Sequence, residues 1–201
     1  YEIKEFDDTK RLIALYGIAS AVKYIHEHKV VFRNLKPENI LLDEFLFPKV
    51  EFVFQYLYDY DGYDEKVNIY LDPSIEYNDY TESSDVCTFA LIAYEILMRK
   101  KIHFYVKTVE DIAKMLKAGE RPRFDKSRVP EIYKELLELC WAENASERPS
   151  FSEIVDKLKT NSDYITSTIN KEEYYKYIQY VEGNITNPEK EFTKYEIDFP
   201  N

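Results

Sequence analysis

The chain has 201 residues, of which 45% are hydrophobic and 32% are charged, as in an ordinary soluble globular domain. Its net charge of −11 excludes general binding to nucleic acid or to an anionic membrane surface, since both require a basic face. Its 4 glycines lie far apart, which excludes a glycine-rich phosphate loop, and no run of about 20 apolar residues could span a membrane.

Cysteine and histidine give little sign of a metal site. Cys87 and Cys140 lie in apolar helical contexts, which predicts buried free thiols in a reducing cytosol rather than a disulfide. We therefore expect a cytoplasmic protein. His26, His28 and His103 have no metal-ligand spacing relative to the cysteines, and we expect each of them to lie at the surface or at its boundary.

The first half of the chain predicts one helix and a small β element. Apolar residues recur at helical spacing over 9–28, with Thr9 as the expected N-cap. The next segment, 30–43, reads VVFRNLKPENILLD, and its apolar runs VVF and ILL predict two strand ends around a polar loop, since Pro37 prevents one continuous strand. Residues 45–54 predict another short strand, and 56–74 an acidic, tyrosine-rich loop.

Helical patterns dominate the second half. Residues 86–98 are apolar nearly all round, which is typical of a helix buried at the centre of a domain. Amphipathic helices are predicted over 108–118, which Gly119 would end, and then over 130–142 and 150–158. These patterns predict a predominantly α-helical α+β domain over 1–160. A polar tail follows over 161–201, with one short helix at 171–181, and the sequence leaves open whether this tail docks or is disordered.

Short motifs follow one another in a fixed order along the chain. They read LKPENILLD at 35–43, PKV at 48–50, SDV at 84–86 and CWAENASERPSF at 140–151. In this order they resemble the C-terminal lobe of a eukaryotic protein kinase, and the last is similar to the tyrosine-kinase-like branch. The resemblance implies that lobe's fold, with ATP and Mg²⁺ as the family's cofactors. The family's N-terminal lobe, with its glycine-rich loop and phosphate-binding lysine, has no counterpart in this chain.

The resemblance implies that several chemical groups of a kinase are lost. The catalytic aspartate falls at Asn34, whose amide cannot accept a proton at neutral pH, so Asn34 is expected to keep the loop's hydrogen bonds without the chemistry. The main metal-binding aspartate falls at Phe52, which offers no oxygen to Mg²⁺. Glu51 could replace it only if the backbone shifted, because neighbouring side chains of an extended segment face opposite ways. A threonine hydroxyl of serine/threonine kinases is replaced by Val67.

Other positions of the family pattern are retained. Lys36 matches the lysine that contacts the transferring phosphate, and Asn39 matches the asparagine that binds the second Mg²⁺. Asp85 matches a buried aspartate that bonds the catalytic-loop backbone, and Arg33 matches the arginine that binds a phosphorylated activation loop. Scaffold groups are thus kept while proton-accepting and metal-binding acids are lost, which is the pattern expected of a pseudokinase.

Two charge pairings remain hypotheses from the sequence. Asp-Pro-Ser at 72–74 stands where the family has Ala-Pro-Glu, whose glutamate normally pairs with the arginine that matches Arg148. Glu76 could reach Arg148 instead. Carboxylates within 59–65 could pair with Arg33 and order the loop without phosphorylation.

Three functions are open at this point. The first is a catalytically inactive pseudokinase that acts as a scaffold or regulator through a protein partner, either another signalling protein or the missing N-terminal lobe. The second is a weak or atypical ATP-dependent serine/threonine kinase with its N-terminal lobe outside this chain, and with Glu51 or Glu38 in the metal role. The third is a truncated kinase remnant that would expose apolar surface. None has a nucleic-acid or membrane partner.

Overall fold

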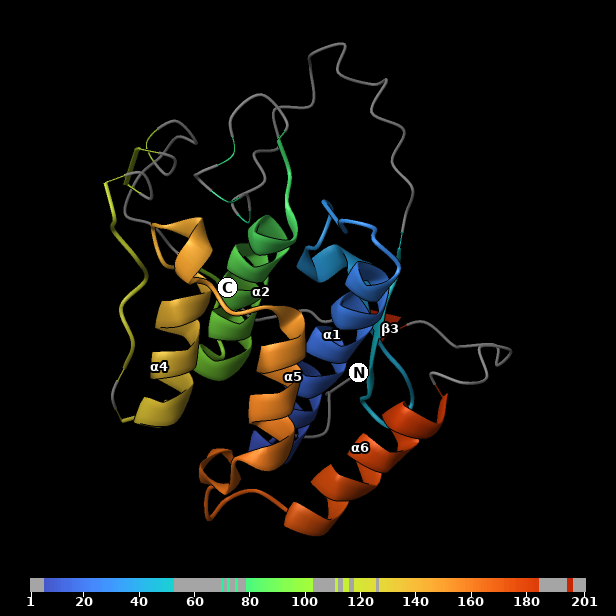
Figure 1. Cartoon of the computed structure of the whole chain (residues 1–201). Coiled ribbons are helices and arrows are strands. Elements are labelled where there is room, and N and C mark those ends of the chain that lie inside the picture. The colour runs from blue at the N-terminus through green and yellow to red at the C-terminus, as the bar shows by residue number, and fades with distance from the viewer. Residues whose placement is uncertain are drawn as a thin grey trace.

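A computed structural model of the chain describes residues 6–52, 70, 72, 75, 79–102, 111, 114–115, 118–125, 127–184 and 195–196. These residues form a mostly helical structure with a small sheet (Figure 1). The longer helices are α1 (Asp8–Glu27), α2 (Glu82–Met98), α4 (Glu131–Cys140), α5 (Phe151–Thr160) and α6 (Lys171–Asn184). The shorter elements are η1 (Pro37–Asn39), η2 (Ala145–Glu147), η3 (Ser162–Tyr164), β1 (Ile40–Leu42), β2 (Pro48–Val50) and β3 (Tyr195–Glu196).

Helix α2 lies at the centre of the helical layer, where it contacts both α1 and α4 (Figure 1). Its residues from Ser84 to Met98 are all buried, so the prediction of a helix buried at the centre of the domain is confirmed. Thr81 and Ser84 close its first turn: the hydroxyl of Ser84 accepts the N–H of Thr81 at 3.2 Å, and the carbonyl of Thr81 accepts the N–H of Ser84 at 3.0 Å. It ends at Arg99, whose φ of 55° leaves the helical region.

Helix α1 covers the predicted segment but begins differently. The carboxylate of Asp7 accepts the N–H of Lys10 at 2.9 Å, so Asp7 rather than Thr9 is the N-cap. Thr9 is buried, and its hydroxyl accepts the N–H of Asn170 at 2.8 Å. The prediction of Thr9 as the cap was wrong because this hydroxyl instead ties the start of α1 to the segment before α6.

The sheet is built on the hairpin of β1 and β2, which pair antiparallel with Ile40 opposite Val50. Strand β3 pairs with the other edge of β1, giving the order β2-β1-β3. The strand predicted within 45–54 is confirmed at β2. The strand predicted at the VVF run, 30–32, is wrong. The N–H of Phe32 bonds a side-chain carboxylate of α2 there, so no neighbouring strand is needed to satisfy it.

The amphipathic helices predicted after α2 are α4, α5 and a segment that ends at Gly119. Helices α4 and α5 confirm the amphipathic segments, and Ser150 caps α5 through a capping box with Glu153. Most of 108–118 lies outside the described residues. At its end Gly119 has φ 78° and the N–H of Glu120 bonds the carbonyl of Met115 at 2.9 Å, as in a helix ended by glycine.

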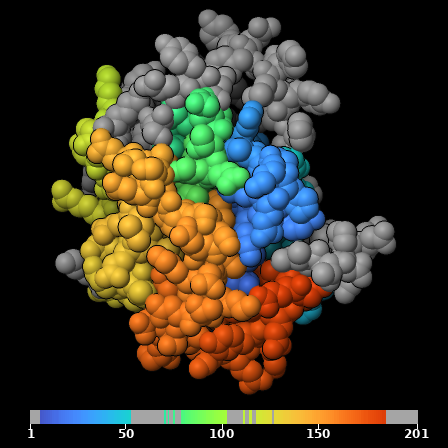
Figure 2. Space-filling model, in the orientation of Figure 1, coloured from blue at the N-terminus to red at the C-terminus, as the bar shows by residue number. Residues whose placement is uncertain are grey.

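The tail docks on the rest of the domain through α6. Tyr174, Tyr177 and Ile178 of α6 are buried, and α6 contacts α1. In the space-filling view, the surface of α5 and α6 is continuous and adjoins that of α1 and the segment after it (Figure 2). No helix among the described residues is long and apolar enough to cross a membrane.

Both cysteines are buried free thiols, as predicted. Burial is the main cause that raises the pKa of Cys87 to about 12, and it also raises the pKa of Cys140. Neither thiol is therefore available as a thiolate at neutral pH, which is the behaviour of a small core residue.

Glu95 is a buried acid in the middle of α2. Its side chain is 0% exposed, and it accepts the hydroxyl of Tyr70 at 2.8 Å and the N–H of Ile102 at 2.7 Å. Burial is the largest cause that raises the pKa of the Glu95 carboxyl above its ordinary value of 4.5. The acid joins α2 to the segments before and after it.

This raised pKa predicts a pH dependence of stability. Above pH 4.5 and up to the native pKa, native Glu95 binds more protons than the unfolded chain does. Its contribution is therefore complete below pH 4.5 and is lost as the pH rises through the native pKa. We expect the unfolding free energy of the wild type to rise relative to that of Glu95→Gln as the pH falls from about 7 towards 5 in urea titrations. Glu135→Gln, at an exposed site between Lys134 and Leu136, is the control; a difference independent of pH would contradict the prediction.

Candidate functional site

Asp85, near the start of α2, holds the backbone of the segment that contains Asn34 and Lys36. Its Oδ2 accepts the N–H of Phe32 at 2.7 Å, and its Oδ1 accepts the N–H of Arg33 at 2.9 Å. Arg33 has a φ of 64°, a left-handed conformation that is uncommon for a residue with a side chain. One buried carboxylate therefore stabilises a strained turn, and it leaves the side chain of Arg33 exposed.

His26 is a third partner of Asp85, and sequence reasoning missed it. Its Nε2 lies 2.8 Å from Asp85 Oδ2, and its ring packs edge-on against Phe151 with 5.2 Å between ring centroids. His26 is buried, so the expectation of a surface or boundary histidine was wrong for this residue. The signal was its position: it lies four residues after Val22 and seven after Ala19, on the buried face of α1.

Asn34 and Asn39 are brought together by the loop that follows. The Nδ2 of Asn39 donates to the carbonyl of Asn34 at 2.7 Å, and the N–H of Asn34 donates to the carbonyl of Phe32 at 2.8 Å. Lys36 is half-buried between them, and its carbonyl accepts the N–H of Asn39 at 3.0 Å. Since the amide nitrogen of Asn39 faces Asn34, its Oδ1 is the atom that could meet a cation.

Phe52 and Glu51 follow the hairpin and return the chain to this loop. The N–H of Glu51 bonds the carbonyl of Asn39 at 2.8 Å. The ring of Phe52 packs edge-to-face on Phe32, 5.3 Å between ring centroids, and is 41% exposed. An aromatic ring thus occupies the position at which the family resemblance puts the main metal-binding aspartate.

The described residues do not fit the family's pair of Mg²⁺ ions. Mg²⁺ requires oxygen ligands in near-octahedral geometry, and the amide oxygen of Asn39 is one such ligand. No group of three His, Cys, Asp or Glu side chains that could hold a metal occurs within the described part of the chain. Of the two positions that match the family's metal ligands, Asn39 thus offers an oxygen and Phe52 offers none.

Arg148 lies outside this loop, and it forms a buried ion pair with Asp72. Both side chains are 0% exposed, and Arg148 Nη2 donates to Asp72 Oδ1 at 3.2 Å. The guanidinium also donates to the carbonyls of Ala142 at 2.9 Å and Ser83 at 3.2 Å. The hypothesis that Glu76 is the partner of Arg148 is corrected, since Asp72 takes this role; Glu76 itself lies outside the described residues.

Two other sequence predictions fall outside the described residues. They are the carboxylates of 59–65 that were expected to pair with Arg33, and Val67. One loop thus contains Arg33, Asn34, Lys36 and Asn39, and Asp85 holds its backbone through hydrogen bonds. Phe52 lies next to this loop, where its ring packs against Phe32.

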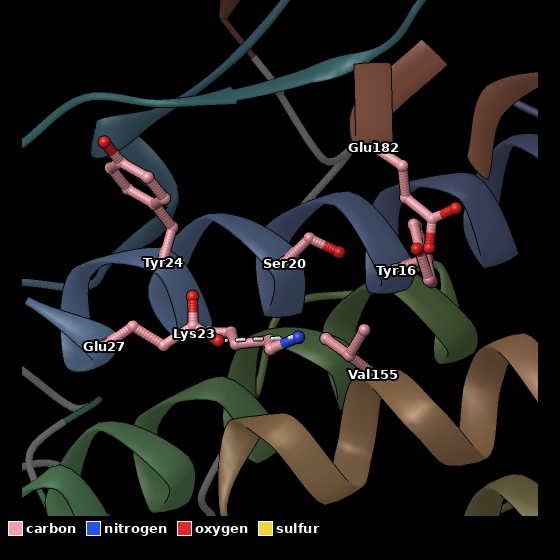
Figure 3. Close-up of a pocket in the computed structure, with 7 residues that line it drawn as sticks. All are labelled: Tyr16, Ser20, Lys23, Tyr24, Glu27, Val155 and Glu182. Carbon is pink, nitrogen blue, oxygen red and sulfur yellow. Dashed lines mark ion pairs between the residues drawn. The ribbon is translucent and has the colours of Figure 1, made fainter. Parts of the chain in front are cut away.

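A small hollow lies elsewhere, between α1, α5 and α6 (Figure 3). Its volume is about 50 Å³, which has room for a few water molecules and is far below the roughly 300 Å³ of a small-molecule site. Its lining includes Ser20 and Tyr16 from α1, Val155 from α5 and Glu182 from α6. The hollow does not contain the loop residues described above and could not hold a nucleotide.

Comparisons with known proteins agree with this architecture. A family model described as protein tyrosine and serine/threonine kinase matches residues 3–158. A probable LIM domain-containing serine/threonine-protein kinase of Dictyostelium discoideum is 32% identical over 77% of this chain and 16% of its own length. The serine/threonine-protein kinase STY17 of Arabidopsis thaliana is 27% identical over 70% of this chain and 25% of its own length. The chain thus spans a quarter or less of the length of these relatives.

Proposed function

The chain belongs to the protein kinase family, and from this premise we propose that it is a pseudokinase, a kinase-like domain that acts by binding a protein partner and transfers no phosphate. The observation that carries the proposal is a division between two sets of contacts. The contacts that shape the loop are formed, while the positions of the proton acceptor and the main metal ligand hold Asn34 and Phe52.

The formed contacts support a maintained fold. Asp85 bonds the loop backbone, Asn39 bonds Asn34, and Arg148 has a buried carboxylate although the family's glutamate is absent. The backbone next to both positions is hydrogen-bonded: the carbonyl of Asn34 accepts Asn39 Nδ2, and the N–H of Glu51, beside Phe52, bonds the carbonyl of Asn39. The lost chemistry therefore results from the side chains and not from a collapsed site.

A weak or atypical serine/threonine kinase is the second candidate. Lys36 and Asn39, which match the residues on phosphate and metal, are both present beside Asn34. The similar proteins from Dictyostelium and Arabidopsis are named serine/threonine-protein kinases, a family that generally uses ATP and Mg²⁺. On this reading, the phosphate-binding groups of an N-terminal lobe would lie outside this chain.

Phosphoryl transfer separates the two candidates. We expect the purified protein, incubated at high concentration with labelled ATP and Mg²⁺, to label itself and a general acceptor protein no faster than its Lys36→Ala variant does. The physical reason is the missing proton acceptor and metal carboxylate, since the loss of a general base alone costs about 10²–10⁴-fold. A rate that exceeds that of Lys36→Ala would contradict the proposal and support the kinase.

Thermal unfolding provides the second measurement. We expect Mg²⁺-ATP to leave the Tm unchanged, because a ligand raises stability only when it binds the native state. A rise in Tm that Asn39→Ala abolishes would locate nucleotide at this loop. A single cooperative transition of the protein alone would also separate both candidates from a remnant, whose exposed apolar surface predicts aggregation.

The partner we propose is a protein, either another signalling protein or a separate N-terminal lobe. The net charge of −11 supports a partner with a basic contact surface, because opposite charge steers association. Two buried free thiols support a reducing compartment, and we place the protein in the cytoplasm on that ground.

A further inference from the structure

Helix α6 joins the domain through an aromatic seam. Tyr177 packs against Phe47 of the β1–β2 hairpin with 4.6 Å between ring centroids, and against Tyr16 of α1 at 6.3 Å. Tyr174 meets Tyr16 edge-on at 6.0 Å, and Tyr180 lies 5.8 Å from Phe47. In Figure 1, α6 lies beside the lower part of α1 and below the strands. The tail helix therefore contacts α1 and the hairpin at once.

Gly17 makes this close contact possible. A Cβ atom at Gly17 would lie 2.2 Å from the hydroxyl oxygen of Tyr177 and 2.5 Å from Cγ of Pro48, both far inside van der Waals contact. Gly17 lies in the middle of α1, where glycine is less favourable than alanine because it has more backbone freedom to lose. A residue that weakens its own helix thus provides the space in which α1, β2 and α6 meet.

The hairpin that α6 contacts follows directly after the loop of the candidate site. Strand β1 begins directly after Asn39, β2 ends at Val50, and the N–H of Glu51 closes the hairpin onto the carbonyl of Asn39. Lys49 of β2 donates to the hydroxyl of Tyr180 at 3.1 Å. A displacement of β2 would therefore act directly on the backbone hydrogen bond of Asn39.

The tail also reaches the opposite edge of the hairpin. Strand β3 pairs antiparallel with β1, with Glu196 opposite Leu41. The hairpin consequently has α6 against β2 and its turn, and β3 along the free edge of β1. We name α6 and β3 together the tail clamp.

We propose that the tail clamp positions the hairpin, and through it Asn39, so that docking of α6 is a regulatory input to the candidate site. Tyr177 is then a positioning residue that acts through Phe47 and Pro48. A partner that binds and removes α6 would loosen the loop of Asn34 and Asn39, and a partner that secures α6 would order it. This goes beyond the proposed function and does not depend on whether the domain transfers phosphate.

Hydrogen exchange of the full chain tests this coupling without a nucleotide. In Tyr177→Ala we expect amides of 40–42 and 49–51 to exchange about tenfold faster, while amides of α2 keep their protection. The matched control is Gln179→Ala, because Gln179 lies on the exposed face of the same helix. An unchanged hairpin beside a faster-exchanging α6 would overturn the proposal. So would an equal increase throughout α2, which reports opening of the whole domain.

Gly17→Ala gives a second test in a folded protein. Helix propensity favours the alanine, whereas the clamp predicts faster exchange at the hairpin because the methyl displaces Tyr177 and Pro48. Adding Tyr177→Phe, which removes the nearest atom, should restore part of the hairpin protection. Gly183→Ala is the control, since a Cβ there meets no heavy atom within 4 Å. If Gly17→Ala protects the hairpin as well as Gly183→Ala does, the proposal is wrong.

Discussion

Replacing Asp85 with asparagine is expected to lower the free energy of unfolding by about 3 kcal/mol or more. Both carboxylate oxygens of Asp85 accept backbone N–H groups, from Phe32 and Arg33, and Oδ2 also meets His26. An asparagine would point an amide N–H at one of these groups, which leaves a buried donor without an acceptor. Denaturant titrations followed by Trp141 fluorescence measure the loss.

The control for Asp85 lies one turn away. Glu82 is also acidic and in the first turn of α2, and it lies 3.9 Å from Nδ1 of His26, but it is exposed and bonds no backbone N–H of the loop, so Glu82→Gln should change stability by no more than about 1 kcal/mol. Hydrogen exchange should report faster exchange of the Phe32 and Arg33 amides in Asp85→Asn. If the variant is as stable as the wild type, this carboxylate does not hold the loop.

Replacing Arg148 with alanine is expected to cost about 3–5 kcal/mol, because it leaves a fully buried carboxylate without its partner. Asp72 is 0% exposed, and its hydrogen bonds to the guanidinium would be lost together with the charge pair. The carbonyls of Ala142 and Ser83 would also lose a donor. Thermal and denaturant unfolding both measure this loss.

Two variants separate charge pairing from packing at this position. Arg128→Ala removes an exposed arginine that pairs with Asp125 at 3.3 Å, and we expect a change below about 1 kcal/mol. Arg148→Met combined with Asp72→Leu removes both charges, and should recover most of the stability lost by the single variant. If Arg148→Ala lowers the free energy of unfolding by less than Arg128→Ala does, the buried pair does not stabilise the domain.

Local periodicity predicted the elements whose own residues decide their structure. The apolar run at 86–98 predicted a central helix, and α2 is buried along its length. The order of the motifs predicted the lobe through the family resemblance. In the structure, the segment that precedes LKPENILLD meets the SDV motif at Asp85. The VVF run failed because its backbone donors are satisfied by a side chain of another helix, which no local pattern contains.

Contacts between distant segments were the part that sequence could not supply. The pairing of Arg148 with Asp72 joins residues 76 positions apart, and a nearby acid such as Glu76 was an equally good candidate by spacing. The tyrosines of α6 could not be assigned partners from the sequence, because Tyr16 and Phe47 come from two distant elements, α1 and the turn before β2. Nothing in the sequence explained a glycine at position 17, because the reason is the close contact with the distant Tyr177.

The pair of Arg148 and Asp72 constrains which residues the core of this chain can accept. A buried arginine without a carboxylate costs several kcal/mol, which is a large part of the stability of a domain. A serine at position 74, where the family has glutamate, is therefore compatible with a buried Arg148 because an acid is present at position 72. Positions 72 and 74 both differ from the family pattern, yet the buried charge of Arg148 is neutralised by a carboxylate in either case. What the core of this chain requires at Arg148 is a carboxylate, and that carboxylate can come from a different position than in the family pattern.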